Sequence, residues 1–267
     1  MELKKILLGS FSWKRLFTSL VLIYVIMNVY IHFISDRMMF PYDRTSYDLN
    51  LPNLSFIVAD NKYKIATRFW KSKDEKNLIL FFHGNYLDLG YLDDFAEKLN
   101  SNGYSVFAMD YRGYGLSQGT ATDKTTYKDS QLLYDTALKM GYSSDQLLIV
   151  GRSIGTGVAT ELALKNNCKA LILISPFVSA YRVMTNIPLL PFDKFNNLAK
   201  ISQISEPLFI IHGTKDIVIK PWHSELIIKK HKGKKQRYLV DGAGHNDILD
   251  YEFENVIQQF QLFIDAI

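Results

Sequence analysis

LLIVGRSIG, at residues 147–155, is the stretch of sequence that decides the fold. Its first four apolar residues predict a buried β-strand, and the apolar spacing from Ile154 to Lys165 predicts the helix that follows. Between them stands the pattern G-x-S-x-G, which in this context is typical of a serine nucleophile on a sharp, strained turn. Only small residues fit two positions before and after such a serine, and Gly151 and Gly155 meet that need. The same glycines fit neither a Walker A loop nor the dinucleotide-binding spacing.

Two later strand ends supply the partners that such a serine needs. The apolar run 208–211 is followed by HGTKD, which ends at Asp216, and the run 238–240 is followed by DGAGH, which ends at His245. A serine hydroxyl needs an imidazole to take its proton and a carboxylate to hold that imidazole in the right tautomer. The chain order Ser, Asp, His is the one found in α/β-hydrolases. We therefore predict Ser153, Asp216 and His245 as the catalytic residues.

The carboxylate and the oxyanion hole are the parts of this site with open alternatives. Asp241 and Asp247 lie close to His245 in the sequence and are rivals for the role given to Asp216. The oxyanion hole of a site of this kind takes one backbone N–H from the residue after the nucleophile and one from the loop after an early strand. We assign these donors to Ile154 and Asn85.

Strands and helices alternate along the rest of the chain. Strands are expected at 54–60, 63–70, 78–82, 104–109, 147–150, 170–174, 208–211 and 238–240, and helices at 92–99, 124–139, 154–165 and 255–267. The first two strands form an early antiparallel pair, and the alternation after them predicts a mostly parallel central sheet with helices on both faces. Ligands of such sheets bind at the carboxyl ends of the strands, where the three predicted catalytic residues stand.

Residues 176–206 form an insertion rich in proline and in large apolar side chains. We expect this insertion to be a short cap over the site, because an apolar cap suits an acyl chain or another hydrophobic substrate. The alternative is that the same side chains pack onto the sheet.

Several sequence blocks together resemble the α/β-hydrolase superfamily, and within it the membrane-anchored branch that contains acyl-protein thioesterases and related esterases. The blocks are HGN at 83–85, DLG at 88–90, DYRGYGLS at 110–117, GRSIG at 151–155, SPF at 175–177, HGTKD at 212–216 and GH at 244–245. The resemblance runs from about Ile57 to the C-terminus. It implies hydrolysis of carboxylic esters or thioesters of a small-molecule or acylated substrate, without a cofactor or metal. Asp110, Arg112 and Tyr114 follow a strand end, where a substrate role is the alternative, and we expect Asp110 and Arg112 to form a loop that braces the nucleophile turn.

Other functions stay open or are disfavoured. The same triad serves peptidases and amidases, and a domain with a silent triad could be used for binding alone. The formal net charge of +4 gives no reason to expect nucleic acid binding. Cys168 is the only cysteine, and we expect it to be a small buried residue rather than a nucleophile. The oligomeric state cannot be derived from the sequence.

Leu16–Ile34 contains no Lys, Arg, Asp or Glu. About 20 mainly apolar residues can cross the hydrocarbon core of a bilayer as one helix. A cleaved signal peptide and an amphipathic helix on the membrane surface are the alternatives. We expect a single-pass anchor and divide the chain into a tail and anchor at 1–36, a connector at 37–54 and an α/β-hydrolase domain at 55–267.

Basic residues set the expected orientation of this anchor. Four basic residues precede the apolar run: Lys4, Lys5, Lys14 and Arg15. Two follow it, Arg37 and Arg44, and these stand beside the aspartates Asp36 and Asp43. The positive-inside rule then places the N-terminus in the cytoplasm and the hydrolase domain on the non-cytoplasmic side of the membrane.

Overall fold

The computed structural model describes residues 12–41, 44–185 and 187–267, and the chain divides into two compact units, 1–39 and 40–267. In the first unit, helix α2 (Trp13–Met39) contains the whole predicted apolar run and is long and apolar enough to cross a membrane. The Asn28 side chain, which interrupts that run, donates a hydrogen bond to the carbonyl of Tyr24 at 2.7 Å. Lys4, Lys5 and Asp43, which entered the orientation argument, lie outside the described residues.

The second unit is built on one sheet of eight strands, in the order β1-β2-β4-β3-β5-β6-β7-β8. The strands are β1 (Leu54–Ala59), β2 (Tyr63–Trp70), β3 (Asn77–Phe82), β4 (Tyr104–Met109), β5 (Leu147–Arg152), β6 (Ala170–Ile174), β7 (Leu208–Gly213) and β8 (Lys235–Val240). β1 and β2 pair antiparallel to each other, β2 pairs antiparallel to β4, and β3 to β8 run parallel. The predicted α/β-hydrolase fold with a mostly parallel sheet is therefore confirmed.

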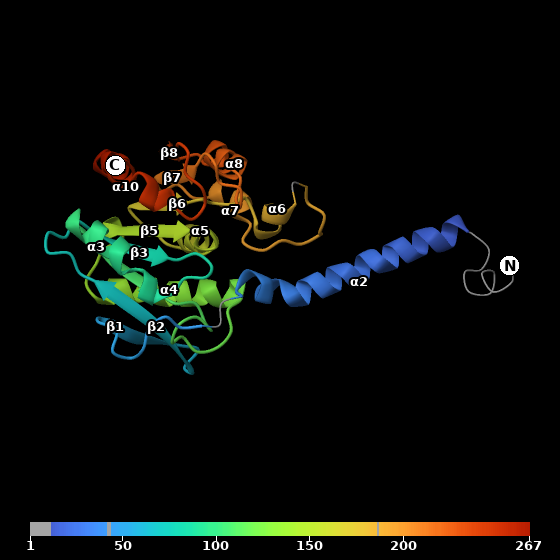
Figure 1. The fold of residues 1–267 in the computed structure, drawn as a ribbon, viewed down its shortest axis with the longest axis horizontal. Coiled ribbons are helices and arrows are strands. Elements are labelled where there is room, and N and C mark those ends of the chain that lie inside the picture. The colour runs from blue at the N-terminus through green and yellow to red at the C-terminus, as the bar shows by residue number, and fades with distance from the viewer. Residues whose placement is uncertain (1–11, 42–43, 186) are drawn as a thin grey trace. The chain divides into compact units, whose positions relative to one another are not determined.

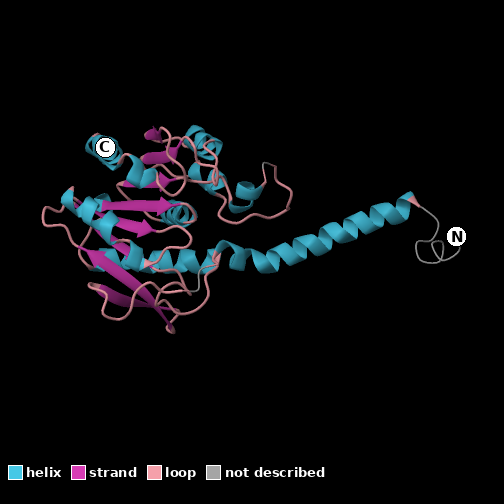
Figure 2. Cartoon of the chain, in the orientation of Figure 1, coloured by secondary structure: helices cyan, strands magenta, loops and turns pink. Residues whose placement is uncertain are grey.

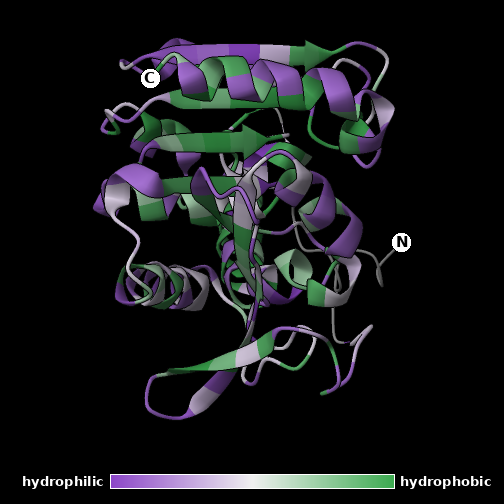
Figure 3. Cartoon of the chain, turned by 90° about the vertical axis from the view of Figure 1, so that its left-hand side faces the viewer, coloured by the Kyte–Doolittle hydropathy of each residue, from purple (hydrophilic) through white to green (hydrophobic). Residues whose placement is uncertain are grey.

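Helices cover both faces of this sheet (Figures 1 and 2). The helices are α3 (Asp93–Ser101), α4 (Asp123–Lys139), α5 (Gly155–Lys165), α6 (Ala180–Met184), α7 (Asn197–Ile201), α8 (Trp222–Lys230), α9 (Ile248–Tyr251) and α10 (Phe253–Asp265), with 3-10 turns η1 (Leu89–Tyr91) and η2 (Ser144–Gln146). Every residue of β3, β4 and β6 is buried, as expected of strands covered on both sides. Hydrophobic residues accordingly concentrate on the central strands (Figure 3).

The parallel register brings the carboxyl ends of β3, β5, β7 and β8 to the same edge of the sheet. On one face, α3 and α10 share a buried cluster with alternate residues of the strands, such as Phe81 and Val150. On the other face, α5 packs against β3, β5 and β6. The loops that carry the four predicted strand-end blocks therefore meet at one edge.

The insertion at 176–206 was expected either to cap the site or to pack onto the sheet, and different parts of it match each expectation. Phe177 and Phe195 are buried within the hydrolase unit. In contrast, Met184, Ile187 and Leu189 are 80%, 61% and 51% exposed. The ends of the insertion therefore pack on the fold, while its middle presents apolar side chains that the fold does not cover.

Candidate active site

Ser153 occupies a strained turn between β5 and α5. Its φ angle is +53°, a left-handed conformation that residues other than glycine rarely adopt. A Cβ added to Gly151 would lie 2.4 Å from the carbonyl oxygen of Gly155, and one added to Gly155 would lie 2.1 Å from the carbonyl oxygen of Phe82. Both positions therefore require glycine, for the steric reason that the sequence pattern predicts. The turn lifts the serine out of the strand and into the loop region at the edge of the sheet.

Ser153, His245 and Asp216 form one chain of hydrogen bonds. The Ser153 hydroxyl lies 3.0 Å from His245 Nε2, and His245 Nδ1 lies 2.7 Å from Asp216 Oδ2. When Nδ1–H donates to the carboxylate, Nε2 is left free to accept the serine proton. The structure thus brings together the three side chains that the sequence singled out, in the geometry of a general base between a nucleophile and an orienting carboxylate.

Asp216 is held as a carboxylate by its surroundings. The residue is 3% exposed, and its Oδ1 accepts hydrogen bonds from the backbone N–H groups of Val218 at 2.9 Å and Ile219 at 2.8 Å. Burial alone raises the pKa of Asp216, but hydrogen bonds from His212 and His245 and the backbone donors outweigh it and hold the pKa well below its ordinary value. A permanently ionised Asp216 can stabilise a protonated His245.

The rival carboxylates have other partners. Asp241 Oδ1 accepts a hydrogen bond from the Thr214 hydroxyl at 3.0 Å. Asp247 Oδ1 accepts one from the backbone N–H of Gly244 at 2.7 Å. Within the part of the chain that the structure describes, Asp216 is the carboxylate hydrogen-bonded to the His245 ring.

The loop after β3 lies directly against the nucleophile. A Cβ on Gly84 would be 3.4 Å from the Cβ of Ser153, so the backbone here passes close to the serine. Ile154 is the N-cap residue of α5, where helix N–H groups have no partner inside the helix. Next to Gly84, Asn85 accepts a hydrogen bond from the Tyr114 hydroxyl at 3.3 Å through its side-chain oxygen. The two predicted oxyanion donors thus lie in the segments that flank Ser153, and their role stays a prediction.

Comparison with known proteins identifies the family. A family model described as serine aminopeptidase, S33 matches residues 73–200. The human alpha/beta hydrolase domain-containing protein 17B is 37% identical over 204 residues, which cover 74% of this chain and 70% of that protein. This chain belongs to the α/β-hydrolase superfamily. Protein 17C of the mouse is similar to this hydrolase at 35% identity over 187 residues, with 68% of this chain and 58% of that protein covered.

Solved structures agree with the fold of the hydrolase. The Pyrococcus furiosus esterase Pf2001 matches with a TM-score of 0.69 at 18% identity, over 84% of this chain and 97% of that one. A soluble variant of the monoglyceride lipase from Saccharomyces cerevisiae matches with a TM-score of 0.67 at 18% identity, over 84% of this chain and 98% of that one. These structures support the fold, and the family model and the relatives make the chain a serine hydrolase.

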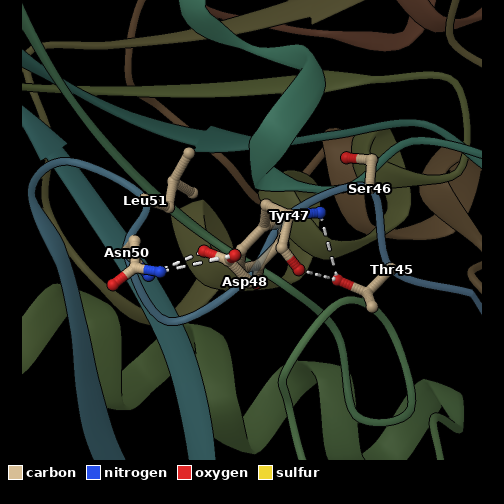
Figure 4. Close-up of a pocket in the computed structure, with 6 residues that line it drawn as sticks. All are labelled: Thr45, Ser46, Tyr47, Asp48, Asn50 and Leu51. Atoms are coloured by element: carbon tan, nitrogen blue, oxygen red, sulfur yellow. Dashed lines mark hydrogen bonds between the residues drawn. The ribbon is translucent and has the colours of Figure 1, made fainter.

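The connector ahead of β1 is attached to the loop after β3. The backbone N–H of Ser46 donates to Asp88 Oδ2 at 2.7 Å, and the Tyr47 hydroxyl donates to Asp110. The other oxygen of Asp110 accepts the backbone N–H of Leu89 at 3.0 Å. Residues 45–48, 50 and 51 also line an open hollow of about 520 Å³, to which no triad residue contributes (Figure 4). The sequence gives no signal for these contacts, since the partners are 42 and 63 residues apart.

An aromatic cluster extends this attachment to the loop that carries Asn85. Phe40 is buried, with its ring centroid 5.8 Å from that of Tyr111 and 6.3 Å from that of Tyr114. The Tyr111 hydroxyl donates to the carbonyl of His83 at 2.7 Å, and the Tyr114 hydroxyl donates to Asn85. The start of the hydrolase unit therefore supports the loop from which an oxyanion donor is predicted.

The expected Asp–Arg brace of the nucleophile turn is wrong for Arg112. Its guanidinium pairs with Asp129 of α4 at 2.7 Å and with Asp60 of the β1–β2 turn at 2.8 Å. Asp110 instead supports the loop after β3, and His83 Nε2 lies 3.3 Å from its carboxylate. The two side chains therefore support different segments, Asp110 the loop after β3 and Arg112 the contact between α4 and the β1–β2 turn.

Cys168 is buried, and burial raises the pKa of its thiol well above the ordinary value. A thiol in that state is a poor nucleophile. Among the described residues, no group of three or more His, Cys, Asp or Glu side chains is arranged to hold a metal ion.

Tyr47→Phe is expected to lower kcat of the hydrolase roughly 3- to 10-fold and to leave KM within about twofold. The substitution removes a hydrogen bond to the buried Asp110, which contributes about 0.5–1.5 kcal/mol and supports the loop beside Ser153. The matched control is Tyr134→Phe, which removes a hydroxyl that donates to the carbonyl of Asn167 at 2.8 Å, in contacts that include no triad residue. Steady-state kinetics on an activated ester measures both. Equal kcat values for the two variants would contradict the role of Tyr47.

Proposed function

We propose that this hydrolase cleaves carboxylic esters or thioesters of acyl substrates through an acyl-enzyme on Ser153. His245 takes the proton of the Ser153 hydroxyl as its oxygen attacks the acyl carbonyl, and then gives that proton to the leaving alcohol or thiol. A water molecule, deprotonated by His245 in turn, releases the acid and restores the serine. The observation that carries the proposal is the unbroken hydrogen-bond chain from Ser153 through His245 to the ionised Asp216.

The oxyanion formed in each half-reaction is stabilised, in this proposal, by the backbone N–H groups of Asn85 and Ile154. The N-terminus of α5 adds a partial positive charge at the same place. One donor of this kind typically contributes about 3–4 kcal/mol to transition-state stabilisation. Because these donors belong to the backbone, their positions depend on the loop after β3 and on the turn at Ser153.

A hydrophobic acyl group is the substrate class that the surroundings favour. Ile217, which directly follows Asp216, is 86% exposed, and Val218 is 51% exposed. The middle of the 176–206 insertion adds the exposed apolar side chains of Met184, Ile187 and Leu189. Exposed apolar side chains near a catalytic edge are typical of sites that receive hydrophobic ligands.

We further propose that α2 anchors the hydrolase in a membrane, with the N-terminus in the cytoplasm and the hydrolase unit on the other side. The length and composition of the helix and its charge bias support this, although signal sequences share the first two features. Protease protection in intact cells or vesicles tests the orientation. A hydrolase unit that resists protease added to the cytoplasmic face of sealed membranes, and is digested once detergent opens them, fits the proposal. Digestion from the cytoplasmic face of sealed membranes contradicts it.

The substrate proposal is tested with the full chain in non-ionic detergent and two series of substrates, p-nitrophenyl esters and acyl thioesters from C2 to C16. We expect kcat/KM to rise with chain length beyond C4, since each buried methylene contributes up to about 0.8 kcal/mol. A sharp preference for acetyl would remove the acyl-chain proposal while leaving the triad in place.

Aminopeptidase activity is the second candidate, because the matching family model is described as serine aminopeptidase, S33. The same triad can cleave an amide if its leaving amine is protonated by His245. Aminoacyl p-nitroanilides in the same assay separate the candidates. The esterase proposal predicts kcat/KM values for these amides far below those for the best ester.

A further inference from the structure

A second cavity lies behind the loop that carries His245. It has a volume of about 140 Å³ and is bordered by α3, the loop after β3 and the segment 249–253. Its walls are largely apolar, and Phe95, Leu249 and Phe253 also line a smaller apolar cavity of about 40 Å³ between the sheet and α10. Neither Ser153 nor His245 lines either cavity.

Arg152 and Lys98 are the cations that border the larger cavity, and Arg152 lies nearest in sequence to the nucleophile. Its Nη2 donates to the backbone carbonyl of Asn246 at 2.9 Å and, more weakly, to that of His245 at 3.5 Å. Within residues 12–41, 44–185 and 187–267, the guanidinium has no carboxylate within 4 Å, and its Nε and Nη1 donors have no protein acceptor. Arg152 is half-buried, and burial lowers the pKa of its guanidinium, partly offset by the charge of Asp250.

The other charged groups at this cavity are arranged differently. Lys98 pairs with Asp94 at 2.8 Å, with both side chains in contact with solvent, so these two charges compensate each other. Asp250 is exposed, and water and salt screen its charge. Among the described residues that border the cavity, the half-buried cation without a carboxylate partner is therefore Arg152.

We propose that this cavity is a binding site for an alkyl carboxylate, with the carboxylate on the Arg152 guanidinium and the alkyl chain against Phe95, Leu249 and Phe253. A guanidinium presents parallel N–H donors that match the two oxygens of a carboxylate, and the pair is strongest where water is excluded. The apolar walls select a chain without polar groups. The site is separate from Ser153, so binding there does not depend on the hydrolase mechanism.

The size of the cavity sets the expected chain length. At roughly 10–15 Å³ of this kind of volume for each water-sized group, 140 Å³ holds about ten non-hydrogen atoms. Octanoate, with ten such atoms, fits that limit. Because Arg152 also holds the carbonyls of His245 and Asn246, a bound carboxylate would contact the group that supports the catalytic loop.

The test is isothermal titration of sodium octanoate into the full-length protein in non-ionic detergent, with protein-free micelles as the blank. Octanol and octylamine are titrated in parallel to separate the contribution of the carboxylate from that of the alkyl chain. We expect saturable octanoate binding in the wild type, at least tenfold weaker binding to Arg152→Gln, and no saturable binding of octylamine. The matched control is Arg237→Gln, because Arg237 is a partly buried guanidinium that likewise donates to a carbonyl, that of Pro221 at 2.9 Å, and borders neither cavity.

A second variant maps the site independently of Arg152. Leu249→Trp fills the cavity from a different element, and it is expected to remove octanoate binding while circular dichroism stays that of the wild type. Binding no stronger than to empty micelles overturns the proposal. So does octanoate binding that neither Arg152→Gln nor Leu249→Trp changes, since the ligand would then occupy another part of the chain, such as the acyl site at Ser153.

Discussion

Ser153→Ala is expected to lower kcat of the hydrolase on a p-nitrophenyl ester by at least about 10³–10⁴-fold, with KM changed by less than about threefold. The substitution removes the oxygen that forms the acyl-enzyme, whereas the N–H groups and apolar surfaces that bind substrate remain. The strain of the turn is also retained, because alanine has the same Cβ at a φ of +53°. The residual rate should be that of an uncatalysed attack by water in a preformed oxyanion hole.

The control for this substitution is Ser130→Ala, which removes a hydroxyl that donates to the carbonyl of Tyr127 inside α4. Purified full-length protein in detergent is assayed for turnover and for labelling by a fluorophosphonate probe. Wild type and Ser130→Ala should both be labelled, and Ser153→Ala should not. If Ser153→Ala keeps a tenth or more of the wild-type kcat, the acyl-enzyme proposal is wrong.

Asp216→Asn is expected to cost about 10³–10⁴-fold in kcat, nearly as much as the loss of the serine. The amide has no charge to stabilise a protonated His245. Its NH₂ group can also donate to Nδ1, which would place the imidazole proton on Nε2 and leave no base facing Ser153. The substitution conserves size, so the loss should appear in kcat and not in the folded state.

Asp241→Asn and Asp247→Asn are the matched controls, and each is expected to change kcat by less than about threefold. Both keep an oxygen that can accept the present hydrogen bonds from Thr214 and Gly244. Stopped-flow or steady-state kinetics on the same ester compares the three variants. A loss of kcat at either control position equal to that of Asp216→Asn would show that Asp216 is wrongly assigned as the orienting carboxylate.

The fold and the meeting of the triad side chains could be predicted because both follow from local pattern. Apolar runs mark the buried strands, and parallel strands bring their carboxyl ends to one edge, so residues that follow separate strands come together there. The left-handed turn at Ser153 is likewise indicated by the glycines at positions 151 and 155. The catalytic roles of Ser153, Asp216 and His245 stay predictions until the kinetics are measured.

Features that depend on long-range packing could not be predicted. A Cβ on Gly157 would lie 2.3 Å from the ring of Phe195 in the insertion after β6, a contact that no local pattern indicates. β8 begins at Lys235, earlier than the apolar run 238–240 indicates. Charged residues are common on an exposed edge strand, where they give no hydrophobic signal.

The contacts of Phe40, Ser46 and Tyr47 have a consequence for how the hydrolase unit can be separated from α2. Phe40, Ser46 and Tyr47 are part of the support for the loop beside the nucleophile, although they precede the first strand. Proteolysis after Tyr47 would release a domain whose sheet and triad are intact. Its loop beside the nucleophile, however, would lose the support of these three residues. Cleavage ahead of Phe40 would instead release a hydrolase unit that keeps these contacts and its full turnover.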